Sequence, residues 1–255
     1  MNTLVQWGLT NLILFALFAT LFFYLRRANT RKVEELAERL KPEALAHGWN
    51  VATELSGRER TVRWTGTEQD VRWKAEDIFR KHPKSSSKNR GLSVTRWHSI
   101  GLRGTSAPVL LMGLPEGTEV PKAQPPPEGM FGALAMKAVY FALDKTLDLY
   151  FGDQIGQSVD AGALKRVERY EEQVPGFAVM AQNPADAANL FSRGLAEVIA
   201  NHFSSAPESM QGYRRPWILF LPDGVVMARM GEAESAAALA PLVRAGVAIT
   251  RAVRF

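Results

Sequence analysis

Three arginine–tryptophan pairs are the residues of this sequence best suited to binding chemistry. They are Arg63-Trp64, Arg72-Trp73 and Arg96-Trp97, and Lys74 directly follows the second pair. A guanidinium recognises phosphate and carboxylate groups, and an indole on the same surface can stack on a nucleic-acid base. Each pair falls in a segment that alternates between apolar and charged residues, which is typical of a strand.

This spacing leaves two arrangements open. Neighbouring residues of a strand point to opposite faces, so the tryptophans can line a core while the basic residues face outward. With other strand registers, indole and guanidinium groups would share one face. We favour the first arrangement, because apolar residues that alternate with charged ones indicate a half-buried sheet. The candidate binding face contains Arg63, Trp64, Arg72, Trp73, Lys74, Arg96 and Trp97.

Residues that would commit the chain to catalysis are sparse. The sequence has no cysteine, which excludes thiolate chemistry and cysteine-bound metals. It also lacks the phosphate-binding loop, the dinucleotide-binding glycine motif and the common hydrolase motifs. The four histidines, His47, His82, His98 and His202, lie too far apart for a metal site of local spacing. We therefore name no catalytic, cofactor-binding or metal-binding residue, and we expect no cofactor.

Paired carboxylates are the one remaining acid–base feature. They are Glu76-Asp77, Glu171-Glu172, and Asp144 with Asp148 at helical spacing. Such a pair can bind a cation or move a proton. Carboxylates next to lysine more often form a solvated face, and we expect that here.

Residues 4–25 form an uncharged apolar stretch of 22 residues. As a helix it would be about 33 Å long, enough to cross a hydrocarbon core of about 30 Å. The alternative is a cleaved signal peptide, but no basic residue precedes the stretch and no small-x-small cleavage site follows it. The sequence therefore predicts a transmembrane anchor in residues 1–25.

The flanks of this stretch predict its orientation. Its amino-terminal side has no lysine or arginine, whereas Arg26, Arg27, Arg31 and Lys32 follow it. Basic residues stay on the cytoplasmic side, so we expect an outside amino terminus and a cytoplasmic domain. These four residues would lie at anionic lipid headgroups. Residues 48–110, with 12 basic and 6 acidic side chains, extend the basic character beyond the flank.

The rest of the first half predicts a juxtamembrane helix over 26–48 and a basic β-rich subdomain over 49–113. The helix stripe consists of Val33, Leu36, Ala37 and Leu40, and Pro42 should break or kink the helix. Strands at 61–65 and 71–76 are joined through 66–70 into a hairpin, and further strands are expected at 92–99 and 108–114.

The second half begins with a proline-rich linker over 114–130, followed by an α+β subdomain over 131–255. Five prolines mark the linker. The helix expected at 131–151 is best explained as a core helix, with an interfacial helix or a second span as alternatives. The remaining predictions are a strand at 177–181, one long helix capped by Asn183, a hairpin over 217–229 and a helix over 235–253. Clustered strands favour an α+β fold with mostly antiparallel sheets packed with helices.

Several of these segments resemble a group of bacterial membrane-anchored proteins of uncharacterised activity. The segments are 60–66, 70–76, 95–97 and 177–181 with the helix and hairpin that follow. The resemblance implies a single N-terminal helix and a cytoplasmic α+β domain, and it implies no activity. Together with the expected orientation, it gives a bacterial inner membrane as the expected location.

Together these features predict a membrane-anchored cytoplasmic binding or adaptor module rather than an enzyme. Its expected partners are the lipid bilayer, anionic headgroups and an unknown protein, and nucleic acid is not favoured. Two alternatives stay open: an enzyme whose site is assembled only in the fold, and a membrane-tethered nucleic-acid binder.

Overall fold

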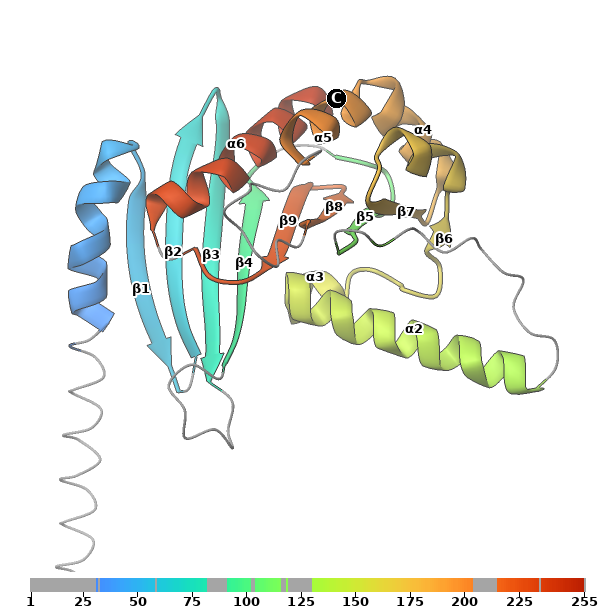
Figure 1. Cartoon of the computed structure of the whole chain (residues 1–255), viewed down its shortest axis with the longest axis horizontal. Helices are drawn as coiled ribbons and strands as arrows, with labels where there is room; N and C mark the ends of the chain where they lie inside the picture. The colour runs from blue at the N-terminus through green and yellow to red at the C-terminus, as the bar shows by residue number, and fades with distance from the viewer. Residues whose placement is uncertain are drawn as a thin grey trace, which may run out of the picture.

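In a computed structural model, the described strands form one antiparallel sheet with helices on both faces (Figure 1). The description covers residues 31, 33–57, 59–81, 91–101, 104–115, 118, 130–203, 215–233 and 235–254. The predicted α+β class with a large antiparallel sheet is confirmed.

The nine strands of the sheet follow the order β1-β2-β3-β4-β9-β8-β5-β7-β6. The strands are β1 Asn50–Ser56, β2 Glu59–Glu68, β3 Val71–Lys81, β4 Gly91–Ser99, β5 Val109–Gly113, β6 Lys165–Arg166, β7 Phe177–Ala181, β8 Trp217–Leu221 and β9 Gly224–Met230. The helices are α2 Met130–Phe151, α3 Asp153–Gly156, α4 Pro184–Ser192, α5 Leu195–Phe203 and α6 Ala236–Ala252, with a 3₁₀ turn, η1, at Glu168–Gln173. A further helix at 33–46 precedes β1.

Alternating residues of the central strands supply two hydrophobic cores. Leu111 and Ile218 belong to the core that α4, α5 and α6 cover. Leu110 and Leu219, one residue along each strand, belong to the core under α2 and α3. Strands buried on both faces read as continuous apolar runs, which explains the sequences of β5, β8 and β9.

The helix at 33–46 packs against β1, and its predicted amphipathic stripe is confirmed. Leu40 and Ala44 are buried, and the Thr53 hydroxyl donates a hydrogen bond to the Val33 carbonyl at 3.0 Å. Of the break or kink predicted at Pro42, the break does not occur, because the helix continues to residue 46. Pro42 is exposed, and the buried residues on either side of it hold the helix against the strand. The helix ends before Gly48, whose φ of 71° favours glycine.

The hairpin of β2 and β3 is confirmed, but its strands are longer than predicted. Gln69 and Asp70 alone form the turn, both with positive φ as in a two-residue hairpin. Gly66 lies within β2 instead of in the turn. A Cβ at Gly66 would come within 2.8 Å of the Trp73 ring and 2.9 Å of the Trp49 ring, so glycine serves indole packing here.

The predicted helix cap at Asn183 is confirmed, Ser235 is a further cap, and one predicted helix divides in two. Asn183 accepts a hydrogen bond from the Ala185 amide, and Ser235 accepts one from the Ala238 amide. The single helix expected after Asn183 is α4 followed by α5. Gly194, with φ of 84°, turns the chain between them.

Helix α2 departs from the core role predicted for it. Its carboxyl-terminal residues Leu147, Tyr150 and Phe151 are buried under the sheet. Its amino-terminal half extends past the sheet edge, where Leu134 and Phe141 are exposed (Figure 1). The structure therefore corrects the prediction of a core helix for half of α2.

No helix within the described residues is long and apolar enough to span a membrane. The predicted anchor over residues 1–25 lies outside them, as do Arg26, Arg27 and Lys32 of the basic flank. Most of the predicted linker over 114–130 also lies outside them. Strands from both sides of that linker pair in the one sheet through β4 and β9, so the sheet itself is not divided there.

Candidate functional site

The three arginine–tryptophan pairs lie on adjacent strands, with their members on opposite faces of the sheet. The pairing aligns Trp64, Ala75 and Trp97 in one row across β2, β3 and β4. Arg63, Glu76 and Arg96 form the neighbouring row, which points to the other face. The favoured arrangement, with tryptophan inside and arginine outside, is the one observed.

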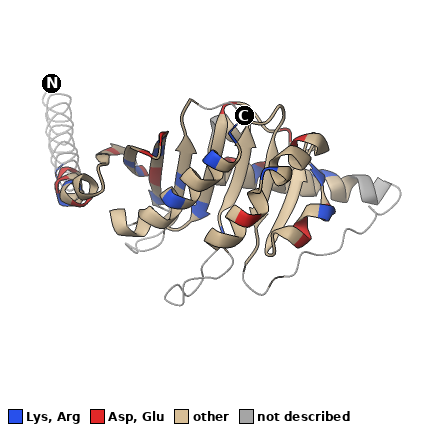
Figure 2. Ribbon diagram, turned by 90° about the horizontal axis from the view of Figure 1, so that it is seen from above, with Lys and Arg blue, Asp and Glu red and all other residues tan. Residues whose placement is uncertain are grey.

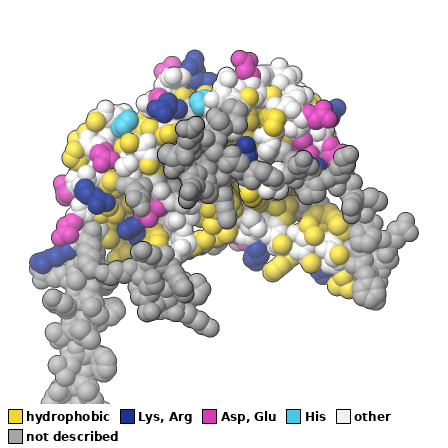
Figure 3. Space-filling model, viewed as in Figure 1, with side chains coloured by type: hydrophobic (Ala, Val, Ile, Leu, Met, Phe, Trp, Pro, Cys, Tyr) yellow, Lys and Arg dark blue, Asp and Glu magenta, His cyan; other side chains and the backbone are white. Residues whose placement is uncertain are grey.

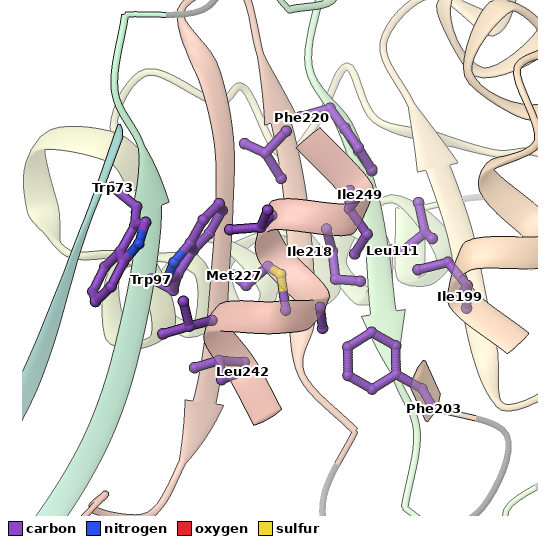
Figure 4. Packing of buried hydrophobic residues seen from close by; sticks show 14 of the residues in the cluster. Trp73, Trp97, Leu111, Ile199, Phe203, Ile218, Phe220, Met227, Leu242 and Ile249 are labelled. Carbon is purple, nitrogen blue, oxygen red and sulfur yellow. The ribbon is translucent and has the colours of Figure 1, made fainter. Parts of the chain in front are cut away.

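The tryptophans belong to the core beneath α6. Trp64, Trp73 and Trp97 are at most 1% exposed, and Figure 4 shows Trp97 beside Met227 and close to Leu242 of α6. A Cβ at Gly246 of α6 would come within 2.6 Å of the Trp97 ring, so the helix approaches as closely as a glycine allows. The indoles cannot stack on a ligand, which removes them from the candidate binding face.

A buried carboxyl, Asp77, shares the tryptophan face. It accepts hydrogen bonds from the Thr95 hydroxyl at 2.5 Å, the Ala233 amide at 3.1 Å and the Trp64 indole at 3.2 Å. Burial raises the pKa of Asp77 to about 6, although these donors act in the opposite direction. Through these donors Asp77 ties β2, β4 and the segment before α6 to β3, and its burial closes the carboxyl to a ligand.

The outward face of β1 to β4 is charged, and we call it the polar sheet face. Its members are Glu54, Arg63, Arg72, Lys74, Glu76, Arg96 and His98. Figure 2 shows acidic and basic residues interspersed on the strands at this end of the sheet, while the central strands carry few charges. Over the central strands, α2 and α3 cover the same face.

Two of the predicted arginines on this face are engaged within the protein. Arg63 lies 3.1 Å from the Glu76 carboxylate and 3.7 Å from that of Glu54. Arg96 donates from Nε to the Tyr150 carbonyl at 2.6 Å and from Nη2 to the Leu149 carbonyl at 3.1 Å. A cation at the carboxyl end of a helix satisfies open carbonyls and complements the helix dipole. Arg96 therefore fixes the end of α2.

Arg72 and Lys74 are the cations of this face that remain available. Arg72 is exposed and Lys74 is half-buried, and neither side chain forms a hydrogen bond or ion pair with any described residue. His98 lies opposite Lys74 in the strand pairing. Burial, and then the Lys74 charge, lower the pKa of His98, whose ring nitrogens have no hydrogen-bond partner. Arg72 and Lys74 form a basic cluster near the Val71 end of β3, and His98 lies beside Lys74.

The carboxylate pairs do not converge on a site. Glu76 and Asp77 point to opposite faces of β3, and Asp148 pairs with Lys145 at 3.4 Å. The Glu171 carboxylate accepts hydrogen bonds from Nε and Nη2 of Arg166, at 2.8 and 2.6 Å, and this contact raises the pKa of Arg166. Across the described segments, no group of three acidic or histidine side chains is arranged to hold a metal ion.

The chain matches no protein-family model, no curated protein and no solved structure. The chemistry of the described residues must therefore support any function on its own.

Asp186 is a structural carboxylate whose role the sequence does not indicate. Asp186 is 5% exposed and accepts hydrogen bonds from the Ser106 amide and hydroxyl and from the Ala107 amide, at 2.7 to 3.1 Å. It joins the start of α4 to the segment that enters β5. An acidic residue in the first turn of a helix is common, so its sequence position gives no hint of this second role.

Proposed function

We propose that this chain is a single-pass membrane-anchored module that binds an acidic protein partner in the bacterial cytoplasm. The anchor is the apolar stretch at 4–25, and the basic residues that follow it favour a cytoplasmic domain. This architecture agrees with the resemblance to membrane-anchored bacterial proteins noted from the sequence.

The available cations of the polar sheet face carry the proposal of a binding role. Arg72 and Lys74 lie two residues apart on one strand, point to the same face and have no partner among the described residues. Neighbouring Arg63 and Arg96 have their charges engaged within the protein. An acidic segment laid across β3 would find two cations there in a fixed spacing of about 7 Å.

The position of the cluster favours a protein over lipid headgroups. Strand β3 ends at Lys81 on the side of the molecule where the described chain begins, and starts at Val71 on the opposite side (Figure 1). Ten residue steps at about 3.3 Å place these ends roughly 33 Å apart. If the anchor precedes residue 31, Arg72 and Lys74 face the cytoplasm, beyond the roughly 10 Å over which surface charge acts.

Binding is favoured over catalysis because the perturbed ionisable groups are scattered. Asp77 and His98 lie on opposite faces of the sheet, and His202 lies on α5, where burial lowers its pKa. An active site instead gathers such groups around one substrate position.

Affinity capture of the full chain from membranes in mild detergent tests this proposal. The Arg72→Glu/Lys74→Glu double variant should lose at least ten-fold of a partner that the native chain captures, since each change replaces attraction with repulsion. The matched control is Arg39→Glu/Lys165→Glu, which reverses two exposed basic residues elsewhere and should retain the partner. Equal loss with both double variants, or equal retention, would contradict a binding role for this cluster.

A further inference from the structure

The amino-terminal half of α2 presents apolar side chains that the rest of the described chain leaves uncovered. Leu134 is 59% exposed, Val139 57% and Phe141 64%. Figure 3 shows hydrophobic side chains gathered over this helix at the lower right of the molecule. Leu134 and Phe141 are seven residues apart and share one side of the helix, whereas Val139 points to another side. Soluble surfaces carry single exposed apolar residues, but two large ones on one helix side mark a candidate contact site.

Three features of the molecule lie along the same side as this helix. The lower side in Figure 1 contains the start of the helix at 33–46, the strand ends at Ser56 and Lys81, and α2. A flat surface brought to this side would meet the beginning of the described chain and α2 together.

The length of chain that precedes residue 31 identifies that surface. Six residue steps separate Leu25, the last residue of the apolar stretch, from Arg31. A fully extended chain covers about 3.5 Å per residue, so Arg31 lies at most roughly 20 Å from the end of the anchor. With the proposed anchor in the bilayer, the start of the helix at 33–46 is therefore held close to the membrane surface.

We propose that the amino-terminal half of α2 lies in the bilayer interface as a second membrane contact. This inference rests on the proposed anchoring by residues 4–25. Leu134 and Phe141 would enter the acyl boundary, and Lys137 and Lys145 would extend to the headgroups. Lys145 Nζ lies 5.8 Å from the centroid of the Phe141 ring, so the cation and the apolar ring share one side of the helix. The helix is too short in apolar length to cross the membrane, which leaves an orientation along the surface.

Two contacts fix the tilt of the domain, which a single anchor cannot do. Arg96 holds the carboxyl end of α2 to β4. A contact of α2 with lipid is thereby transmitted to the sheet and sets the direction in which Arg72 and Lys74 face.

Site-specific fluorescence on the full chain in nanodiscs tests the inference. The sequence has no cysteine, so Leu134→Cys and Phe141→Cys each give one attachment point for an environment-sensitive dye. With one chain per disc, both probes should emit at shorter wavelength than the same dye free in buffer. Nitroxide-labelled lipid should quench both probes. Leu45→Cys is the matched control, since Leu45 is 71% exposed at the far end of its helix and should stay unquenched.

Each result separates this inference from the proposed anchoring. If the chain stays in the discs but the probes at 134 and 141 are as unquenched as the Leu45→Cys probe, the α2 contact is overturned. The proposed anchor is unaffected by that result. A chain that does not enter discs at all overturns both. The dye emission can also shift without quenching by lipid and in a way that depends on protein concentration. That result assigns the α2 face to a second copy of the chain and also overturns the inference.

A charge substitution provides an independent measurement. With the dye at 141, Leu134→Glu should abolish most of the quenching by lipid, whereas Leu45→Glu should not change it. Both sites are exposed, so neither substitution disturbs the core. Quenching that is unchanged by Leu134→Glu contradicts an apolar contact.

Discussion

Among single residues, Asp77 is a buried carboxyl whose pKa is raised by burial and lowered by its hydrogen bonds. Its carboxyl is 1% exposed and has a pKa raised to about 6, against 3.8 for a free aspartate. The folded state therefore binds the proton more tightly than the unfolded state. Stability from this group is fully present below about pH 4 and is lost as the pH rises through about 6. The shift of about two units corresponds to about 3 kcal/mol.

We therefore predict that Asp77→Asn changes how the free energy of unfolding depends on pH. The amide side chain keeps the acceptor for Thr95 and Ala233 but faces the Trp64 N–H with its own donor. The variant should be less stable than the native chain at pH 4, and this difference should shrink by about 2 kcal/mol by pH 7 because asparagine does not titrate. Chemical denaturation in mild detergent, followed by tryptophan fluorescence, measures both.

Thr95→Val serves as the control for this prediction. It removes one donor that lowers the pKa of Asp77 but leaves the carboxyl in place, so the pH dependence should persist and move to higher pH. A gap between native chain and Asp77→Asn that stays constant from pH 4 to 7 would show that Asp77 does not titrate in this range.

At the scale of elements, Arg96 links the polar sheet face to α2. Arg96→Met retains most of the side-chain stem but removes two hydrogen bonds to helix carbonyls. We expect a loss of about 1–3 kcal/mol and faster amide hydrogen exchange in residues 145–151. Arg63→Met removes an exposed ion pair and should cost less than about 1 kcal/mol without a change in α2. Unaltered exchange in α2 with Arg96→Met would contradict the role of Arg96 at the helix end.

The sequence predicted most elements because their local patterns are strong. Apolar–charged alternation located β2 to β4, and Asn183 and Ser235 marked two helix starts that the structure confirms. Strand β1 was missed because it is an edge strand with few buried side chains. Gly66 and Gly194 were misassigned because the reason for each glycine, indole packing or a turn between helices, lies outside its local sequence.

The candidate site was predicted in part. Alternation correctly assigned Arg63, Arg72 and Lys74 to an outer face. It could not show that Glu54 and Glu76 engage Arg63 or that α2 engages Arg96, because those partners are 9 to 54 residues away. The sequence alone therefore predicts a basic face, but only the folded structure shows which of its cations remain available.

At the scale of the whole molecule, pairing of β4 with β9 joins halves of the chain that look independent in sequence. Residues 94–98 meet residues 226–230, a separation that no local pattern encodes. The resulting sheet has one charged end and one apolar, helix-covered centre. The membrane proposal places the lower side of this sheet at the bilayer and its basic cluster away from it.

In the proposed topology, the four basic residues after the apolar stretch set the orientation of the chain. Each contributes about 1 kcal/mol at an anionic surface, at most about 4 kcal/mol in total, which is small beside a membrane-spanning helix. Arg26, Arg27, Arg31 and Lys32 should thus set direction and not affinity. Replacing all four by glutamate should leave the chain in the membrane fraction with a scrambled or inverted topology.

The central claim is an anchored chain with its domain in the cytoplasm, and paired reporters fused after Phe255 test it most directly. A fluorescent protein that folds only in the cytoplasm should be active in the membrane fraction of cells. Alkaline phosphatase, which is active only outside the cytoplasm, should be inactive at the same position. Activity of the phosphatase with the native flank, or a fluorescent fusion found entirely in the soluble fraction, would contradict the account.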